Sequence, residues 1–217
     1  MRKKYRTSPP PVPQRRRRMF WRRVVFLGMV LAAGMSWVSE RPDGQEPAAA
    51  ETEYVPYALD DTLKEQIRAQ AQIEGIEEKV NDLYALVMVE SGGSGEDVFQ
   101  ASESLGLKPD SLSRDESIQQ GVCYYAQRLH EGSALGADQD CIFQAYNYGK
   151  DFLYYAADRG GIYSFEMAQE YAAQKADHVR VDYNNPIAVS ENGGWRYAYG
   201  NMFYVQLIHQ ALDALDE

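Results

Sequence analysis

The sequence has 217 residues and a formal net charge of −10, enough chain for one medium-sized domain with a real core. Ten of the 22 Lys and Arg residues fall within residues 1–23, which contain no acidic residue. The rest of the chain holds 12 basic and 32 acidic residues, so a basic head precedes an acidic body. Such a head is typical either of a nucleic-acid arm or of the cytoplasmic flank of a membrane segment.

The stretch that follows the head decides between these two. Residues 24–38 are fifteen uncharged, mostly apolar residues, shorter than the roughly 20 of a typical spanning helix. Phe20 and Trp21 can lengthen the run, while Arg22 and Arg23 can extend toward the membrane surface. The positive-inside rule then places residues 1–23 in the cytoplasm and the body outside. We therefore predict a single-pass signal-anchor, with the cell membrane and no nucleic acid as a partner.

A cleaved signal peptide of the same polarity is the competing interpretation. No small-x-small cleavage site follows the run directly, although three alanines stand at 48–50. Both interpretations export the body. Residues 39–56, rich in Glu, Pro and Ala, are predicted to be a linker before a domain at 57–217. Outside the membrane, Cys123 and Cys141 could form a disulfide or remain buried thiols, and their spacing favours neither.

Helical periodicity and glycine stops divide the body into a series of helices. The expected helices span residues 63–74, 77–91, 113–130, 139–148, 151–158, 164–176 and 201–215. Thr62 with Glu65, and Ser113 with Glu116, have the spacing of capping boxes. Residues 97–104 are expected to be a short polar helix or irregular, 132–136 a loop and 178–200 irregular. With no series of alternating strands, the predicted fold class is all-α.

Glu90 stands at the end of the second expected helix. At about 100° a residue it lies on or beside the face that carries Val80, Leu83 and Val87, which should point into a core. Ser91 and two glycines then break the chain. A carboxylate at an apolar helix end is desolvated, and desolvation favours the protonated form that a general acid needs near neutral pH.

Three short segments carry a family resemblance. They are Glu-Ser-Gly-Gly at 90–93, Gln-Ala-Ser-Glu-Ser at 100–104 and Ala-Tyr-Asn-Tyr-Gly at 145–149. Their order resembles the lysozyme-like fold of soluble lytic transglycosylases and goose-type lysozymes. The fuller stretch VMVESGGSGEDVFQASES, with SIQQGV and AYNYG, is similar to single-domain muramidases of Gram-positive surfaces and to the N-terminal half of two-domain wall hydrolases. The resemblance covers roughly residues 57–212.

The resemblance assigns roles to individual residues. Glu90 matches the catalytic acid, and Ser91 matches the hydroxyl beside it. Gln100 and Ser102 match a segment of the cleft wall, where the usual Gly-Leu-Met-Gln is replaced by Asp-Val-Phe-Gln at 97–100. The aromatic and amide side chains that line the sugar site are also matched. These are Tyr146 and Asn147.

Two further residues are candidates for substrate binding. Glu103 lies inside the second motif and is either a site carboxylate or a solvated helix residue. Tyr199, in the aromatic stretch at 195–200, is a candidate for a loop that lines the cleft. The three histidines and two cysteines are scattered without the spacing of metal ligands, so we predict no metal and no cofactor.

Cleaving a glycosidic bond needs an acid for the leaving oxygen and a group that stabilises an oxocarbenium-like centre. A two-carboxylate lysozyme would need a second acid, and spacing does not choose among Glu96, Asp97, Glu103 and Asp151. A lytic transglycosylase needs none, because the muramic acid 6-hydroxyl attacks while the same glutamate turns from acid to base. The resemblance leaves both products open.

The predicted protein is thus a peptidoglycan glycosidase, either an N-acetylmuramidase or a lytic transglycosylase. It is anchored in the membrane with its domain on the cell-wall side, and it cuts the MurNAc-β-1,4-GlcNAc bond of glycan strands with Glu90. The alternative is a weakly active or inactive scaffold that binds peptidoglycan, or other cell-wall proteins, at synthesis or division sites.

Overall fold

The computed structural model describes residues 59–216. The predicted basic segment at 1–23, the anchor at 24–38 and the linker at 39–56 lie outside the described residues. Among residues 59–216, no helix is both long enough and apolar enough to cross a membrane. The described body is mostly helical, as expected, with one small two-stranded sheet.

The body begins with a helix, a 3-10 turn and a second helix. Their bounds are α1 (Asp61–Glu74), η1 (Glu77–Lys79) and α2 (Val80–Glu90). The predicted capping box at Thr62 and Glu65 is wrong, because α1 starts earlier and the Asp60 carboxylate accepts from the Leu63 amide. Gly75 ends α1 in the left-handed conformation, as predicted.

A long helix follows the turn at residues 101–105. These elements are η2 (Ala101–Leu105), α3 (Arg114–Leu135) and α4 (Gln139–Tyr148). The capping box of Ser113 and Glu116 is confirmed. The predicted loop at 132–136 is wrong, since α3 continues to Leu135. Gly132 is buried within it, where a Cβ atom would lie 2.5 Å from Ile142 Cγ1. This glycine permits close packing of α3 on α4 and does not end the helix.

The last third of the chain holds the main difference from the prediction. Its elements are α5 (Asp151–Ala157), α6 (Phe165–Lys175), β1 (Arg180–Asp182), α7 (Pro186–Asn192), β2 (Trp195–Tyr197) and α8 (Tyr204–Asp213). The stretch 178–200 was expected to be irregular, yet β1 and β2 pair antiparallel on either side of α7. Strands of three residues are too short for an alternating pattern to reveal them. The last helix starts at Tyr204, three residues later than expected.

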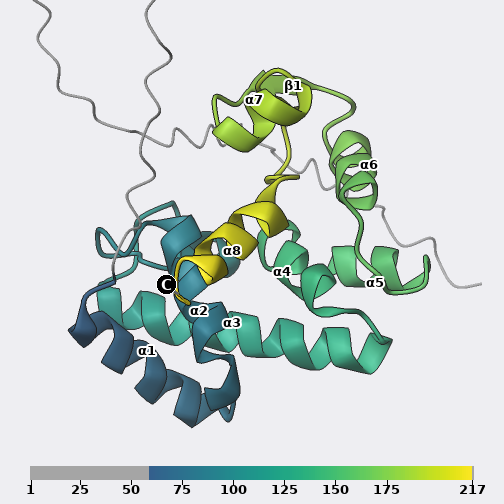
Figure 1. The fold of residues 1–217 in the computed structure, drawn as a ribbon. Coiled ribbons are helices and arrows are strands. Elements are labelled where there is room, and N and C mark those ends of the chain that lie inside the picture. The colour runs from purple at the N-terminus through teal and green to yellow at the C-terminus, as the bar shows by residue number, and fades with distance from the viewer. Residues whose placement is uncertain (1–58, 217) are drawn as a thin grey trace, which may run out of the picture. The chain divides into compact units, whose positions relative to one another are not determined.

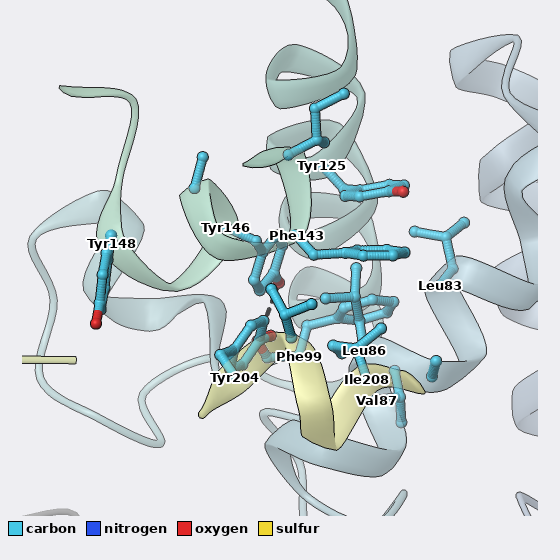
Figure 2. Close-up of a cluster of buried hydrophobic side chains, with 14 of the residues drawn as sticks. Leu83, Leu86, Val87, Phe99, Tyr125, Phe143, Tyr146, Tyr148, Tyr204 and Ile208 are labelled. Atoms are coloured by element: carbon cyan, nitrogen blue, oxygen red, sulfur yellow. Dashed lines mark hydrogen bonds between the residues drawn. The ribbon is translucent and has the colours of Figure 1, made fainter. Parts of the chain in front are cut away.

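The core forms where α2 meets the last helix. Six consecutive residues of α2, from Leu83 to Met88, are buried, so this helix is covered on nearly all sides. The last helix, α8, packs against both α2 and α4, and α3 packs between α1 and α4 (Figure 1). Figure 2 shows Phe99, Tyr146 and Tyr204 in the same buried cluster as Leu86 and Val87 of α2. The chain thereby delivers Glu90 to the border of its core.

Candidate active site

Glu90 is held by a residue from the far end of the chain. The hydroxyl of Tyr204, the first residue of α8, donates to Glu90 Oε1 at 2.6 Å. Tyr204 is itself buried, while Glu90 keeps part of its surface accessible. The packing of α8 against α2 therefore fixes the direction of the Glu90 carboxyl.

Burial is the main cause of an altered acidity at this carboxyl. It raises the pKa of Glu90 from an ordinary value of 4.5 to about 7. The hydrogen bond from Tyr204 opposes this shift because it favours the charged form, while the charges of Asp97 and Glu103 reinforce it. Near neutral pH this group can both hold and release a proton, which is what a general acid and base requires.

Asp97 lies seven residues later in a very different setting. It is 2% exposed, and its two oxygens are covered by donors from two segments. Oδ1 accepts from the Ala101 amide at 2.8 Å and from the Ser117 hydroxyl at 2.7 Å. Oδ2 accepts from the amide and the hydroxyl of Ser102. This carboxylate organises the backbone beside Glu90, and its charge acts on Glu90 from inside the protein.

The two serines of the predicted site bond to the protein itself. Ser91 Oγ donates to the Val98 carbonyl at 2.7 Å and accepts from the Gly93 amide at 3.1 Å. Ser102 is 0% exposed. Besides bonding to Asp97, its hydroxyl accepts from the amides of Ser111 and Leu112. A hydroxyl with this burial supports the segment at 97–103 from inside the protein.

Gln100 and Glu103 lie on the wall segment nearer to solvent. Gln100 adopts a left-handed φ of 47°, and its amide nitrogen donates to the Asp97 carbonyl at 3.1 Å and to Asp110 Oδ1 at 3.0 Å. Glu103 is exposed. Partial burial and the charge of Asp97 raise its pKa.

The Ala-Tyr-Asn motif occupies the end of α4, beneath and beside Glu90. Tyr146 is buried, and its hydroxyl donates to the Phe99 carbonyl at 3.1 Å, which joins α4 to the wall segment. Its ring meets that of Tyr124 edge-on at 5.3 Å. Asn147 Oδ1 accepts from the Asn201 amide at 2.6 Å and so joins the end of α4 to the approach to α8.

Tyr199 lies in a group of aromatic rings on the other side of this motif. Its hydroxyl donates to the Tyr148 carbonyl at 2.9 Å, and its ring lies 5.3 Å from the Tyr148 ring. Tyr171 approaches the Tyr199 ring edge-on at 6.0 Å. Tyr199 is partly exposed, so one side of this aromatic group faces solvent.

The structure thus brings Glu90 together with the wall segment at 97–103 and with Tyr146. The three motifs do converge, although their serines face inward. Two residues at the site were missed by sequence reasoning, Tyr204 as a contact of Glu90 and Asp97 as the buried acid. Asp97 was among four acids that spacing did not separate. Tyr204 is 114 residues from Glu90, and no local pattern connects them.

No metal-ligand cluster accompanies this site. Within residues 59–216, no three His, Cys, Asp or Glu side chains gather in a way that could hold a metal ion. Cys123 and Cys141 are both free thiols in the structure. Cys141 is buried, and burial raises the pKa of its thiol.

The helical body presents one desolvated glutamate, Glu90, beside the other two motifs. This arrangement indicates a single family of proteins. Residues 61–212 match the family model described as Lysozyme-like, and the chain belongs to this family. Among its relatives in Bacillus subtilis (strain 168), the bifunctional muramidase/DL-endopeptidase CwlT is 31% identical over 148 residues, which cover 68% of this chain and 40% of CwlT. The uncharacterized membrane protein YocA is 26% identical over 155 residues, which cover 71% of this chain and 68% of YocA.

A solved structure is also similar to this chain. A Staphylococcus aureus protein described as similar to lipoprotein, NLP/P60 family, is 45% identical and superposes with a TM-score of 0.69. The match covers 71% of this chain and 54% of that one. This chain therefore corresponds to about half of the length of two of its relatives, CwlT and the staphylococcal protein.

Proposed function

We propose that the protein cleaves the glycan strands of peptidoglycan at the MurNAc-β-1,4-GlcNAc bond, with Glu90 as the single acid and base. The observation that carries the proposal is the Glu90 carboxyl, which is oriented by Tyr204 and raised in pKa to about 7, on a residue that keeps part of its surface accessible. Membership of the lysozyme-like family and the similarity to the muramidase CwlT support the same substrate class.

In the proposed reaction Glu90 donates its proton to the glycosidic oxygen as the bond to the anomeric carbon breaks. The resulting carboxylate then takes a proton from the attacking hydroxyl. That hydroxyl belongs either to water, giving a reducing end, or to the muramic acid 6-position, giving a 1,6-anhydro end. Both outcomes need only one protein carboxyl to exchange a proton.

Asp97, whose charge acts on Glu90, is one candidate for a second carboxylate, and its contacts favour a supporting role. Both of its oxygens accept hydrogen bonds from inside the protein, so neither is available to attack an anomeric carbon. We assign to Asp97 the shaping of the wall segment and part of the raised pKa of Glu90. Ser91 and Ser102 then act as positioning residues for this segment.

The remaining predicted site residues are proposed to contact the glycan. Gln100 and Glu103 lie on the wall at the accessible side, and Tyr199 offers an aromatic face on which a sugar can stack. Tyr146 and Asn147 are proposed to shape the surface between the wall segment at 97–103 and Tyr199. The enzyme is proposed to be anchored in the cell membrane by residues 24–38, with its body on the cell-wall side, as the membrane-protein relative YocA also suggests.

The main alternative is a scaffold that binds glycan or other wall proteins without turnover. The name of the relative CwlT also includes a DL-endopeptidase, but a peptidase that used a cysteine would need an accessible thiolate beside a base. Cys141 is buried, and the Cys123 thiol accepts from Gln127. The described residues therefore favour the glycosidase.

Mass spectrometry of the material released from purified peptidoglycan tests these alternatives. The unaltered protein should release muropeptides, and Glu90→Gln should release about 10²–10⁴-fold less while still binding the wall. Anhydro-muramic ends identify a transglycosylase, and reducing ends identify a muramidase. Binding without release by the unaltered protein supports the scaffold instead.

A further inference from the structure

A glycine-rich loop joins the two carboxylates of the site. Residues 91–96 connect Glu90 to Asp97, and three of the six are glycines with positive φ: Gly92, Gly93 and Gly95. Glycine loses more conformational freedom on ordering than any other residue. A loop of this composition needs contacts from outside to hold one shape, and its shape sets how Glu90 faces Asp97.

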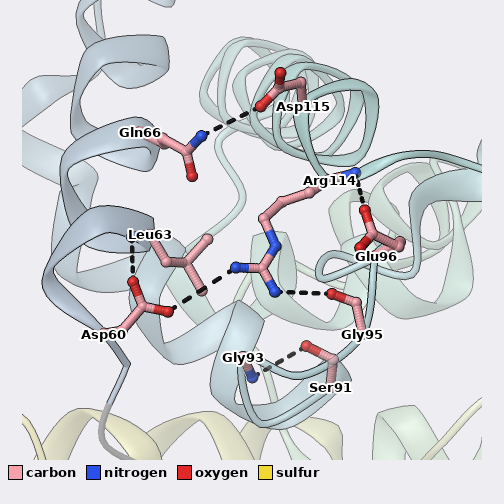
Figure 3. Close-up of polar contacts among 9 residues, drawn as sticks. All are labelled: Asp60, Leu63, Gln66, Ser91, Gly93, Gly95, Glu96, Arg114 and Asp115. Carbon is pink, nitrogen blue, oxygen red and sulfur yellow. Dashed lines mark hydrogen bonds and ion pairs between the residues drawn. The ribbon is translucent and has the colours of Figure 1, made fainter.

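Arg114, the first residue of α3, supplies two of these contacts. Its Nη2 donates to the Gly95 carbonyl at 3.0 Å, and its backbone amide donates to Glu96 Oε2 at 3.2 Å. Its Nη1 lies 3.9 Å from Asp60 Oδ2, so the same guanidinium also reaches the start of α1 (Figure 3). One side chain thus ties the loop to the residue that caps α1.

Leu59 supports the loop from the same side. It is 5% exposed, and its Cδ2 lies 2.7 Å from the position that a Cβ atom on Gly93 would take. Asp60, the next residue, caps α1 at the Leu63 amide. These two residues directly follow the 58 residues that contain the predicted anchor and linker. The part of the body nearest to the anchor in sequence therefore lies against the loop that follows Glu90.

We propose that Arg114 is a positioning residue for Glu90, and that with Leu59 and Asp60 it forms a clamp on the 91–96 loop. The proposal rests on the proposed glycosidase function. In this proposal Leu59 and Asp60, the first residues of the described body, help to hold the candidate active site in shape. A purely structural tie between α1 and α3 would have no such effect.

The clamp acts on the surroundings of Glu90. The groups that face this carboxyl are Tyr204 from α8, Tyr146 from α4, Asp97 at the end of the loop and Glu103 from η2. A released loop admits water to Glu90, while Asp97 stays held by its bonds to Ala101, Ser102 and Ser117. The added water favours the charged carboxylate and lowers the pKa of Glu90. Since the acid must be protonated, the alkaline limb of the activity profile then moves to lower pH.

The chain offers a matched control for this effect. Gln66 Nε2 donates to Asp115 Oδ1 at 3.2 Å, which also joins α1 to α3 but does not touch the loop (Figure 3). Gln66→Ala therefore removes a tie between the same two helices and leaves the clamp intact. The variants of the clamp itself are Arg114→Gln, Arg114→Lys and Leu59→Ala.

The test measures kcat and KM for glycan release by the full-length protein between pH 4 and pH 9. Arg114→Gln should lower kcat at pH 7 roughly tenfold and shift the alkaline limb down by about one pH unit, with little change in KM. For Arg114→Lys, kcat and the alkaline limb should fall between those of Arg114→Gln and the unaltered protein. The lysine ammonium keeps the positive charge but lacks the two Nη groups of the guanidinium. Gln66→Ala should keep the original limb.

An alkaline limb that is the same in Arg114→Gln and Gln66→Ala overturns the clamp. If Arg114→Gln does not fold, the test uses the alkaline limbs of the pH profiles of Arg114→Lys and Leu59→Ala. If neither limb is shifted, the clamp proposal is overturned. The proposed function fails in a different way, by an inactive unaltered protein or by an active Glu90→Gln. The two failures are therefore distinguishable.

Discussion

Glu90 and Asp97 are two carboxylates seven residues apart that the fold treats in opposite ways. Glu90 ends a buried helix, keeps some accessible surface and accepts one hydrogen bond, from Tyr204. Asp97 is almost fully buried and accepts hydrogen bonds on both oxygens from Ala101, Ser102 and Ser117. A carboxyl with few donors is free to exchange its proton, whereas one surrounded by donors holds the backbone in place. The contrast underlies the proposal that Glu90 carries the chemistry and that Asp97 shapes the site.

The largest effect should come from removing the proton of Glu90. Glu90→Gln keeps the shape of the side chain but cannot protonate a leaving group, so glycan release should fall by about 10²–10⁴-fold. Turnover on purified peptidoglycan measures this. Glu78→Gln, an exposed change on η1, is the control and should leave the rate unchanged. Comparable activity in the two variants would remove Glu90 from its role.

The same substitution should stabilise the protein at alkaline pH. Folding raises the pKa of Glu90 from 4.5 to about 7, so the folded state prefers the protonated form. That preference is fully present below pH 4.5 and is lost as the pH rises through 7, at a cost of about 3 kcal/mol. Glu90→Gln avoids this loss. Urea unfolding at pH 5 and pH 8 should show the variant gaining on the unaltered protein only at pH 8.

Asp97→Asn should destabilise the fold and weaken the acid. An amide nitrogen in place of one oxygen leaves a buried donor without an acceptor, which costs about 1–3 kcal/mol. Loss of the negative charge lowers the pKa of Glu90, so the alkaline limb of activity should move to lower pH. Thermal unfolding and a pH–rate profile check both parts. Asp158→Asn, at an exposed position, should change neither.

The smallest of these effects should follow from Tyr204→Phe, and it should have the opposite sign in pH. The Tyr204 hydrogen bond lowers the pKa of Glu90, so its loss raises that pKa and moves the alkaline limb to higher pH. Stability should change by only about 1 kcal/mol. Limbs that move in the same direction in Tyr204→Phe and Asp97→Asn would contradict the electrostatic account.

Much of this arrangement was predictable because it depends on local patterns. Helical periodicity and glycine stops predicted most of the helices, since those signals act within a few residues, but they missed α7 and ended α3 too early. Glu90 was identified because an apolar helix ends in a carboxylate just before a chain break. The helical face and the family motif agreed on the same residue.

The rest depends on contacts between distant segments. The bond from Tyr204 to Glu90 arises because α8 packs on α2, and no short window of sequence contains both. Asp97 is buried whereas Glu96 beside it is exposed, and Asp97 accepts a hydrogen bond from Ser117 of α3, 20 residues further along the chain. The hairpin of β1 and β2 has strands of three residues each, too short to be recognised before their pairing is known.

The most direct test of the central claim is the pH dependence of glycan release by the unaltered full-length protein, with Glu90→Gln measured beside it. The account predicts an alkaline limb with a midpoint of about 7 for the unaltered protein and release at least about 100-fold lower in the variant at neutral pH. A midpoint near the ordinary glutamate value of 4.5, or undiminished release by Glu90→Gln, would contradict it.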